Sequence, residues 1–396
     1  MSSISSSAGL SAARGTLVLQ DRLVPDGVVV TRGSRIEWVG PAQDCVVPEA
    51  LALASTAQWV VPGFVDLHNH GGDGHDFLEA DLNGCRAALK HHRSRGTTTQ
   101  LASLVSAPLD ELEHRLDLLA TLAVDGEIAG IHLEGPFLAA ARCGAHDVQA
   151  LLAGDAHSAS RLLDAGRATV RTMTVAPDVP GSDEVVTVLR SAGIVPSFGH
   201  TDATAATTRA AIGAAGAGTI TATHLFNAMS PWDHRSPGAV TACLAAAGRG
   251  EMVLELIADG VHVADETATT VFDLVGADHV ALVSDSMAAA GRQDGRFRLG
   301  SMDVEVIGGV ARVAGPDRTI AGSLSSVVDL VQRVVRAGVP LVDAVRSATH
   351  VPASVLGLDD VGRLTPGARA DLVLLDDDLD PVHVMRAGAW VTTRTS

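Results

Sequence analysis

The stretch Val60-Val61-Pro62-Gly63-Phe64-Val65-Asp66-Leu67-His68-Asn69-His70-Gly71-Gly72 begins as a strand rich in β-branched and aromatic residues and stops at two glycines. Side chains two positions apart in a strand share a face, so His68 and His70 should point the same way from its C-terminal end. Two imidazoles side by side at a strand end form half of a metal site. We therefore expect the remaining ligands elsewhere in the chain.

Strand-like and helix-like segments alternate through the middle of the chain. Helical stretches rich in Ala, Leu and Arg, such as 82–94 and 182–192, lie between most of the strands. The expected strands are Val61–His68, Thr97–Val105, Ile128–Glu134, Val170–Ala176, Ile194–His200, Thr219–His224, Val253–Ala258 and Val280–Asp285. Eight strands with helical crossovers are typical of a (β/α)8 TIM barrel. A doubly wound open sheet is the alternative, but no G-x-G-x-x-G motif follows the first strand.

Both ends of the chain read as short strands punctuated by Gly, Pro and Asp, for example 27–30 and 370–375. The sequence therefore predicts an α/β fold with two parts. The barrel is expected over residues 59–356, and a discontinuous small β-sandwich domain is expected from residues 1–58 together with 357–396.

Composition excludes some classes of partner. A formal net charge of −17 argues against a general surface for nucleic acid or for an anionic membrane. No apolar run approaches the roughly 20 residues that a transmembrane helix needs, and the start of the chain lacks a secretory signal pattern. Four cysteines lie far apart without a CxxC pair, which is typical of reduced thiols. We expect a cytoplasmic protein with neither nucleic-acid nor membrane partners.

Ionisable side chains stand at the C-terminal ends of the expected strands, where barrel enzymes carry their chemistry. They are His68, His70, Glu134, His200, His224 and Asp285. Imidazole and carboxylate are suitable ligands for a borderline metal such as zinc. Burying so many ionisable groups unpaired is costly, so we interpret the six as a site rather than as core residues.

The order of motifs resembles that of the amidohydrolase superfamily and, within it, the family of N-acetylglucosamine-6-phosphate deacetylases. The resemblance runs from about residue 15 to residue 393. The motifs that carry it are Pro-Gly-Phe-x-Asp-x-His-x-His at 62–70, His-Leu-Glu-Gly-Pro-Phe at 132–137, Gly-His-Thr-Asp-Ala-Thr at 199–204, Thr-His-Leu-Phe-Asn-Ala-Met at 223–229, Ala-Asp-Gly-Val-His-Val at 258–263 and Ser-Asp-Ser-Met-Ala-Ala-Ala-Gly at 284–291.

The resemblance implies a site for one or two divalent ions, with Zn²⁺ favoured and Fe²⁺, Mn²⁺ or Co²⁺ as alternatives. Glu134, His200 and His224 would hold the primary ion, and His68 and His70 with Glu134 would hold a second. Many amidohydrolases bridge two ions with a carboxylated lysine, but the only lysine, Lys90, lies in an expected helix. Glu134 is then the available bridge, and the sequence leaves open how fully the second position is occupied.

The resemblance also implies an activity, the hydrolysis of the acetamide of N-acetylglucosamine 6-phosphate to glucosamine 6-phosphate and acetate. This activity would belong to amino-sugar catabolism and cell-wall recycling. A metal ion lowers the pKa of a bound water towards about 7, giving hydroxide at neutral pH. Asp285 is placed to accept its proton and then to pass a proton to the departing amine.

Six residues are implied to contact this phosphorylated amino sugar. His262, and His146 in the loop that contains Ala145, would contact the sugar or its acetyl group. Asn227 and Ala228, through their backbone amides, and Arg235, through its planar guanidinium, would bind the phosphate. Arg235 would come from the neighbouring subunit, which implies a homodimer.

Three alternatives stay open at this point. Two are other amidohydrolases, an N-acetylgalactosamine-6-phosphate deacetylase and a cyclic-amide hydrolase. The third is a non-catalytic barrel used as a scaffold. The absence of a bridging lysine and the loop of Asn227 and Arg235 count against the cyclic-amide hydrolase. The intact set of candidate ligands counts against the scaffold.

Overall fold

The computed structural model of the chain describes residues 9–316 and 318–391. Its centre is a sheet of eight parallel strands in the order β14-β13-β12-β11-β10-β9-β8-β5. The strands are β5 (Phe64–Asp66), β8 (Thr97–Leu104), β9 (Gly130–Glu134), β10 (Val170–Val175), β11 (Val195–Phe198), β12 (Thr221–Ala222), β13 (Val253–Leu256) and β14 (Val280–Leu282). Each overlaps one of the eight expected strands, which confirms the α/β barrel.

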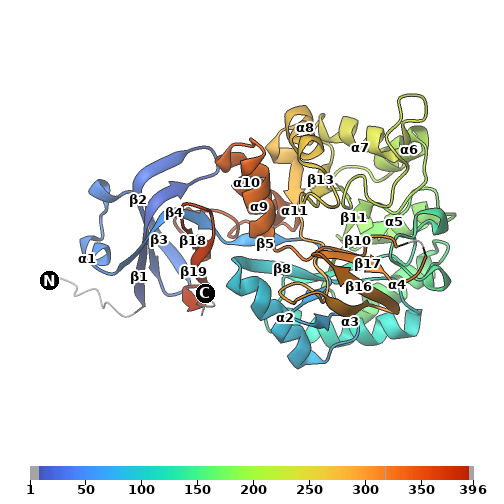
Figure 1. Cartoon of the computed structure of the whole chain (residues 1–396), viewed down its shortest axis with the longest axis horizontal. Coiled ribbons are helices and arrows are strands. Elements are labelled where there is room, and N and C mark those ends of the chain that lie inside the picture. Colours follow the sequence, from blue (N-terminus) through green and yellow to red (C-terminus); the bar gives the residue numbers. More distant parts are fainter. Residues whose placement is uncertain (1–8, 317, 392–396) are drawn as a thin grey trace.

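Helices follow the strands and cover the outside of the barrel, on the right of Figure 1. They are α2 (Leu82–Ser94), α3 (Leu109–Val124), α4 (Ala156–Ala165), α5 (Ser182–Ser191), α6 (Ala205–Ala214), α7 (Gly238–Ala247), α8 (Asp265–Val275), α9 (Val327–Arg336), α10 (Leu341–Ala348) and α11 (His350–Val355). Side-chain caps set several helix starts, because they satisfy backbone N–H groups of the first turn. The Gly84 N–H donates to the Asp81 carboxylate at α2, and Ser326 with Asp329 forms a capping box at α9.

The barrel closes through an isolated parallel bridge between Asn69 and Ser286 rather than through its named strands. In the described residues, β5 and β14 form the two ends of the sheet order. Beyond the ends of these strands, the Asp285 N–H donates to the His68 carbonyl at 2.9 Å and the His70 N–H donates to the Ser286 carbonyl at 2.7 Å. The closing seam therefore runs through residues of the candidate site.

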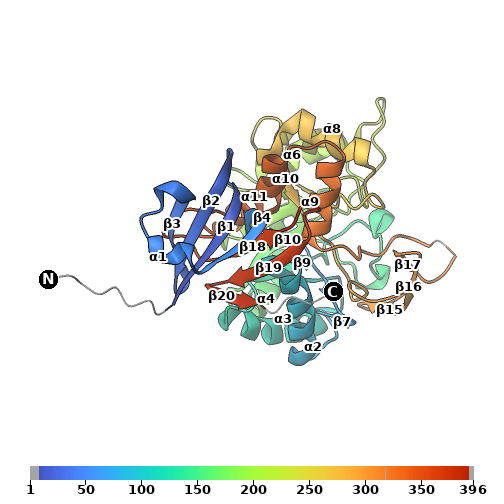
Figure 2. The ribbon, with the colours of Figure 1, turned by 60° about the vertical axis from the view of Figure 1, so that its left-hand side comes forward.

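Both chain ends build a small β domain beside the barrel, on the left of Figure 1 and again in Figure 2. Its strands are β1 (Leu10–Val18), β2 (Leu23–Arg32), β3 (Arg35–Pro41), β4 (Ala54–Pro62), β18 (Leu372–Leu375), β19 (Pro381–Arg386) and β20 (Ala389–Val391). They form one mixed seven-stranded sheet in the order β20-β19-β18-β4-β1-β2-β3, where a sandwich was expected. The β4 strand lies between β1, which is parallel to it, and β18, which is antiparallel.

The strand expected over Val61–His68 is divided between the two parts of the molecule. Val61 belongs to β4 of the terminal sheet, and the barrel strand β5 begins at Phe64. Gly63 makes the turn between them, where a Cβ atom would lie 2.2 Å from the Thr98 hydroxyl oxygen. Only glycine fits so close an approach.

A three-stranded antiparallel sheet between β14 and α9 was not predicted. It consists of β15 (Gly295–Leu299), β16 (Met302–Ile307) and β17 (Val310–Val313). The shorter elements are α1 (Pro48–Leu51), β6 (Gly71–Gly72), β7 (His75–Asp76), η1 (Ala42–Asp44), η2 (Ala140–Arg142), η3 (Val148–Ala150) and η4 (Ala277–His279). Across the described residues, no helix has the length and apolar character required to cross a bilayer.

Candidate active site

Glu134, the last residue of β9, lies between several imidazoles at the C-terminal end of the barrel. Its Oε1 atom is 2.9 Å from the Nε2 atoms of both His200 and His224. Its Oε2 atom is 3.1 Å from Nε2 of His70 and 3.2 Å from Nε2 of His146. Nε2 of His68 lies 3.6 Å from Oε1. One carboxylate thus faces histidines with both of its oxygens.

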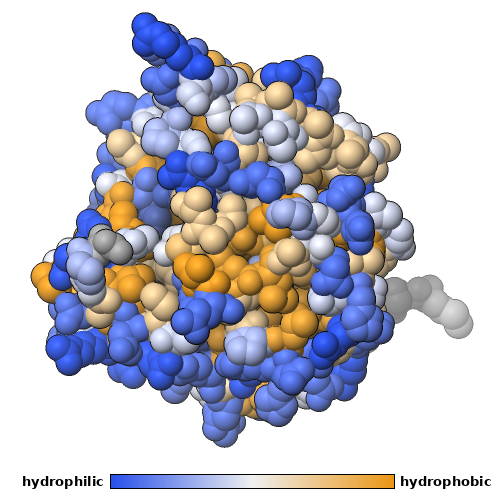
Figure 3. Space-filling model, turned by 90° about the vertical axis from the view of Figure 1, so that its right-hand side faces the viewer, coloured by the Kyte–Doolittle hydropathy of each residue, from blue (hydrophilic) through white to orange (hydrophobic). Residues whose placement is uncertain are grey.

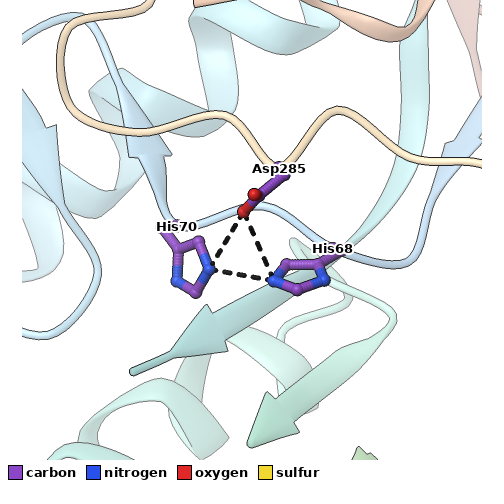
Figure 4. A group of neighbouring side chains, drawn as sticks. All are labelled: His68, His70 and Asp285. Carbon is purple, nitrogen blue, oxygen red and sulfur yellow. Dashed lines mark hydrogen bonds and ion pairs between the residues drawn. The ribbon is translucent and has the colours of Figure 1, made fainter. Parts of the chain in front are cut away.

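A second cluster joins the histidines of the first barrel strand to Asp285 (Figure 4). The Nε2 atoms of His68 and His70 are 2.9 Å apart. One oxygen of Asp285, Oδ1, lies 3.4 Å from the first and 3.3 Å from the second. Side chains from opposite sides of the closing seam therefore meet here.

The backbone is unusual at three of these residues. His200, His224 and Asp285 each follow a barrel strand by two or three residues, and their φ angles are 46°, 29° and 45°. Positive φ is uncommon for residues other than glycine and persists only where the surroundings enforce it. This left-handed turn is shared by three strand ends that deliver side chains to the site.

The hydrogen bonds of Nδ1, the ring nitrogen that faces away from Glu134, distinguish His200 from His146. Nδ1 of His200 lies 2.9 Å from the Arg142 carbonyl and must donate to it, which leaves an Nε2 lone pair towards Glu134. Nδ1 of His146 instead accepts the Ser106 backbone N–H at 3.1 Å. Neutral His146 then carries its proton on Nε2, so it serves as a hydrogen-bond donor and not as a metal ligand.

The imidazoles of the site lower the pKa values of its two carboxylates. Burial opposes ionisation of Glu134, yet the neighbouring imidazoles, His68 first among them, hold its pKa well below the ordinary range. The pKa of Asp285 is lowered in the same way, against burial, by His68 and His70. Both carboxylates are therefore ionised at neutral pH.

The donor set fits divalent cations. When His200 and His224 present Nε2 lone pairs, two lone pairs face one another at 3.1 Å beside a carboxylate oxygen, which is unfavourable without a cation. Glu134, His200 and His224 would hold one ion, and Glu134, His68 and His70 a second. Imidazole nitrogen with carboxylate oxygen suits zinc and other first-row divalent metals.

A cavity of about 250 Å³ opens onto these ligands. Most of the expected site residues line it: His70, Glu134, Ala145, His146, His200, His224, Asn227, Ala228, His262 and Asp285. His68 is fully buried behind the lining residues. Arg235 is exposed on the loop before α7 and is absent from the lining.

Two of the expected substrate contacts are already tied to the protein. The backbone N–H of Asn227 donates to the His224 carbonyl at 3.0 Å, so it reaches a phosphate only by giving up that bond. His262 donates from Nδ1 to Asp259 at 2.8 Å. Although burial opposes it, Asp259 raises the pKa of His262, which favours a donating imidazole.

Sequence reasoning missed one wall of the cavity. Leu299 comes from β15, and Thr319, Ile320 and Gly322 come from the segment that follows β17. The alternation of polar and apolar residues over 296–299 and 303–306 is the strand signal that would have located this insertion.

A barrel whose strand ends gather histidines and acidic residues around a cavity is the architecture of metal-dependent hydrolases. The chain belongs to the amidohydrolase family, whose model matches residues 59–391, and this family is metal-dependent.

Within that family, its relatives act on phosphorylated amino sugars. The chain is 36% identical to the N-acetylglucosamine-6-phosphate deacetylase of Bos taurus, over 81% of this chain and 80% of that protein. It is 33% identical to the N-acetylgalactosamine-6-phosphate deacetylase of Escherichia coli O157:H7, over 85% of this chain and 87% of that protein. It is also similar to a mutant N-acetyl-D-glucosamine-6-phosphate deacetylase of Mycobacterium smegmatis solved with N-acetyl-D-glucosamine-6-phosphate. That structure has a TM-score of 0.90 and 42% identity, and the match covers 97% of this chain and 99% of the other.

Proposed function

We propose that this protein hydrolyses the acetamide of N-acetylglucosamine 6-phosphate to glucosamine 6-phosphate and acetate, with one or two divalent ions, of which Zn²⁺ is favoured. The observation that carries the proposal is Glu134 between two sets of histidines, facing a cavity that Asp285 also lines. The similarity to deacetylases over most of the chain supports the choice of substrate.

The roles of the residues follow from their protonation. A bound divalent ion supplies Lewis acidity and an acidified water at neutral pH. Asp285 is ionised, so it accepts the proton of the attacking water and later returns a proton to the departing nitrogen. His262 is held by Asp259, so it can donate a hydrogen bond to the substrate. His146 carries Nε2–H, which faces Oε2 of Glu134 at 3.2 Å, and it would donate to the substrate by turning away from that oxygen.

The phosphate contacts and the oligomeric state belong to the same proposal. Asn227 and Ala228 line the cavity, whereas Arg235 stands exposed outside it. Arg235 would therefore complete the site of a second copy, in a homodimer. Trp232, close to Arg235, is 52% exposed, and Figure 3 shows an apolar area on the barrel face farthest from the terminal sheet. Exposed apolar surface of this kind supports an interface.

Amine release from purified protein tests the function. Metal-loaded and chelated samples are compared on N-acetylglucosamine 6-phosphate, on N-acetylgalactosamine 6-phosphate and on unphosphorylated N-acetylglucosamine. We expect turnover that requires metal and phosphate and that is faster on the gluco sugar. Turnover after complete metal removal would reject the mechanism, and a preference for the galacto sugar would favour the activity of the Escherichia coli relative.

The proposed setting is the cytoplasm, in amino-sugar catabolism and cell-wall recycling. The four cysteines are free thiols, as a reducing compartment would keep them.

A further inference from the structure

A chain of hydrogen-bonded polar side chains crosses the interior of the barrel close to the metal ligands. Barrel interiors are usually filled by branched apolar residues. Here side chains from β8 to β13 bond in succession, at distances of 2.6 to 3.0 Å. This interior polar chain consists of Ser103, His132, Thr174, Thr223, Ser197, Thr221 and Glu255.

Glu255 is the end of the interior polar chain, and one of its two oxygens is left over. The Thr221 hydroxyl donates to Oε1 of Glu255 at 2.9 Å. The other oxygen, Oε2, has no hydrogen-bond partner among the described residues, although the side chain is only 3% exposed. A buried carboxylate oxygen without a hydrogen-bond partner lowers the stability of the folded state, so a role for this oxygen is expected.

The nearest partner available to that oxygen is the imidazole of His68. Nδ1 of His68 lies 3.5 Å from Oε2 of Glu255, and it too has no hydrogen-bond partner among the described residues. The ring is otherwise fixed, since His132 packs against it edge-on with ring centres 4.5 Å apart. Two buried and complementary atoms thus face each other, each without a hydrogen-bond partner, at a distance about half an ångström longer than a usual N–H···O bond of about 3.0 Å.

We propose that Glu255 is the positioning residue of His68: its carboxylate accepts the Nδ1 proton and thereby keeps the Nε2 lone pair directed at the metal site. A carboxylate behind a ligating histidine fixes the tautomer and raises the basicity of the ligand. The inference rests on the proposed metal-dependent function, and it concerns the ion that His68 and His70 would hold.

The other candidate ligands differ in whether a protein group can hold Nδ1 of the imidazole in place, as Glu255 would for His68. His200 has the Arg142 carbonyl behind it, whereas Nδ1 of His70 lacks a hydrogen-bond partner in the described part of the chain. His68 is therefore the member of its pair that the protein can orient. Loss of Glu255 should weaken the ion at His68 and His70 and spare the ion at His200 and His224.

Metal binding to the chelated chain tests this proposal without any substrate. Zn²⁺ is titrated against a chromophoric chelator, and bound metal is counted by mass spectrometry. Wild-type protein should bind two ions per chain, and Glu255→Gln should weaken one of them about 10–100-fold, the usual cost of losing the hydrogen-bond partner of a ligating histidine. A wild-type chain with a single ion, or a Glu255→Gln protein with two ions of unchanged affinity, would overturn the proposal.

A double-mutant cycle tests whether Glu255 acts through His68 or through the stability of the fold as a whole. His68→Asn should remove the ion at His68 and His70, and adding Glu255→Gln should then leave the affinity for the ion at His200 and His224 unchanged. If Glu255→Gln lowers the remaining affinity in the His68→Asn background, Glu255 acts on the fold and the proposal fails. Glu266→Gln, an exposed position on α8, removes the same charge and should bind metal as wild type does.

A measurement on the unmodified sequence covers the case in which Glu255→Gln does not fold. In metal-loaded protein labelled with ¹⁵N-histidine, the signals of His68 are identified by their loss in His68→Asn. They should show a proton on Nδ1 and metal on Nε2; metal on Nδ1 would overturn the proposal. These measurements need no turnover. If the protein binds metal as described but releases no amine, the proposed function is rejected and the role of Glu255 is not.

Discussion

Asp285 carries the clearest single-residue prediction. It lines the cavity, and its pKa lies below the ordinary range because His68 and His70 outweigh the effect of burial. Asp285→Asn keeps the shape of the side chain but cannot accept a proton. We expect kcat to fall by about 10²–10⁴-fold, the usual contribution of a general acid–base group.

Metal analysis supplies the control for this substitution. The ion at Glu134, His200 and His224 should remain bound in Asp285→Asn, since the carboxylate of Asp285 is not needed there. An Asp285→Asn enzyme with wild-type kcat would exclude it as the proton acceptor.

His92 gives a prediction on pH and stability. It is fully buried on α2, with Nε2 2.9 Å from the Gly71 carbonyl, and burial lowers its pKa to about 3. Below pH 6.5, His92 gains a proton in the unfolded chain but stays neutral in the folded chain. The free energy of unfolding therefore decreases as the pH is lowered from 6.5 to about 3. Each unit of this window corresponds to 1.36 kcal/mol, which gives about 2 kcal/mol between pH 6.5 and pH 5.

His92→Gln keeps a donor towards Gly71 and cannot titrate. Urea unfolding of the chelated protein at pH 6.5 and at pH 5 should therefore show a loss smaller by about 2 kcal/mol than in wild type. His114→Gln, on the exposed side of α3, should retain the wild-type loss. Equal losses in wild type and His92→Gln would contradict this account.

At the scale of elements, the inserted sheet β15–β17 shapes the cavity. Leu299 and Ile320 are apolar members of a lining that is otherwise rich in ligands. Ile320→Ala removes apolar contact area without touching a metal ligand. A lost methylene in a pocket is worth about 1–3 kcal/mol, so we expect kcat/KM for the phosphorylated sugar to drop about tenfold or more.

Steady-state kinetics with metal analysis checks the Ile320→Ala prediction. The metal content of Ile320→Ala should match that of wild type, which would show that the lower kcat/KM comes from lost contact with the substrate and not from lost metal. Ile307→Ala, on an exposed part of β16, is the matched control and should leave kcat/KM unchanged. A similar drop in both variants would show that the sheet acts through its stability instead.

The elements differ in how far the sequence reveals them. The eight barrel strands were predictable because each is a short run rich in apolar or β-branched residues, and several of these runs end at a polar residue, as Ile131 to Glu134 does. The inserted sheet was missed because its strands alternate charged and apolar residues, as Arg296 and Arg298 alternate with apolar neighbours, and so do not form the continuous apolar run of a barrel strand.

The candidate ligands were predictable for a related reason. Parallel strands all present their C-terminal ends at one rim, so residues at those ends must lie together. Glu255 was not predictable in this way. It lies inside β13, and only its contact with Thr221 and its distance to His68 reveal a role.

At the scale of the molecule, bound metal and the closing seam are coupled. The proposed ligands lie at the end of β9 and just after β5, β11 and β12, with Asp285 after β14, so ions link parts of the barrel that are far apart in sequence. An ion that binds only the folded chain stabilises it by about 2.7 kcal/mol at a hundredfold excess over Kd. Chelation should therefore lower the Tm by several degrees in scanning calorimetry, and re-addition of Zn²⁺ should restore it. An unchanged Tm would mean that the site contributes nothing to closure.

Shared sites between two copies predict complementation. Arg235→Ala and Asp285→Asn should each be poorly active alone. When the two proteins are unfolded together and refolded, mixed dimers gain one site with an intact Asp285 and an intact Arg235 from the other copy. Activity should rise above the sum of the separate samples; no rise in confirmed mixed dimers would place Arg235 in its own subunit's site or outside both.

The seven-stranded sheet has a consequence for how the chain is made. The β4 strand ends at Pro62, and its neighbour β18 begins at Leu372, with the whole barrel between them. During synthesis from the N-terminus, the β4 edge stays open until the segment of β18 has left the ribosome. An unpaired edge is a template for association with other chains. A product that stalls before Leu372 would therefore carry an exposed edge, which β18 covers in the folded chain.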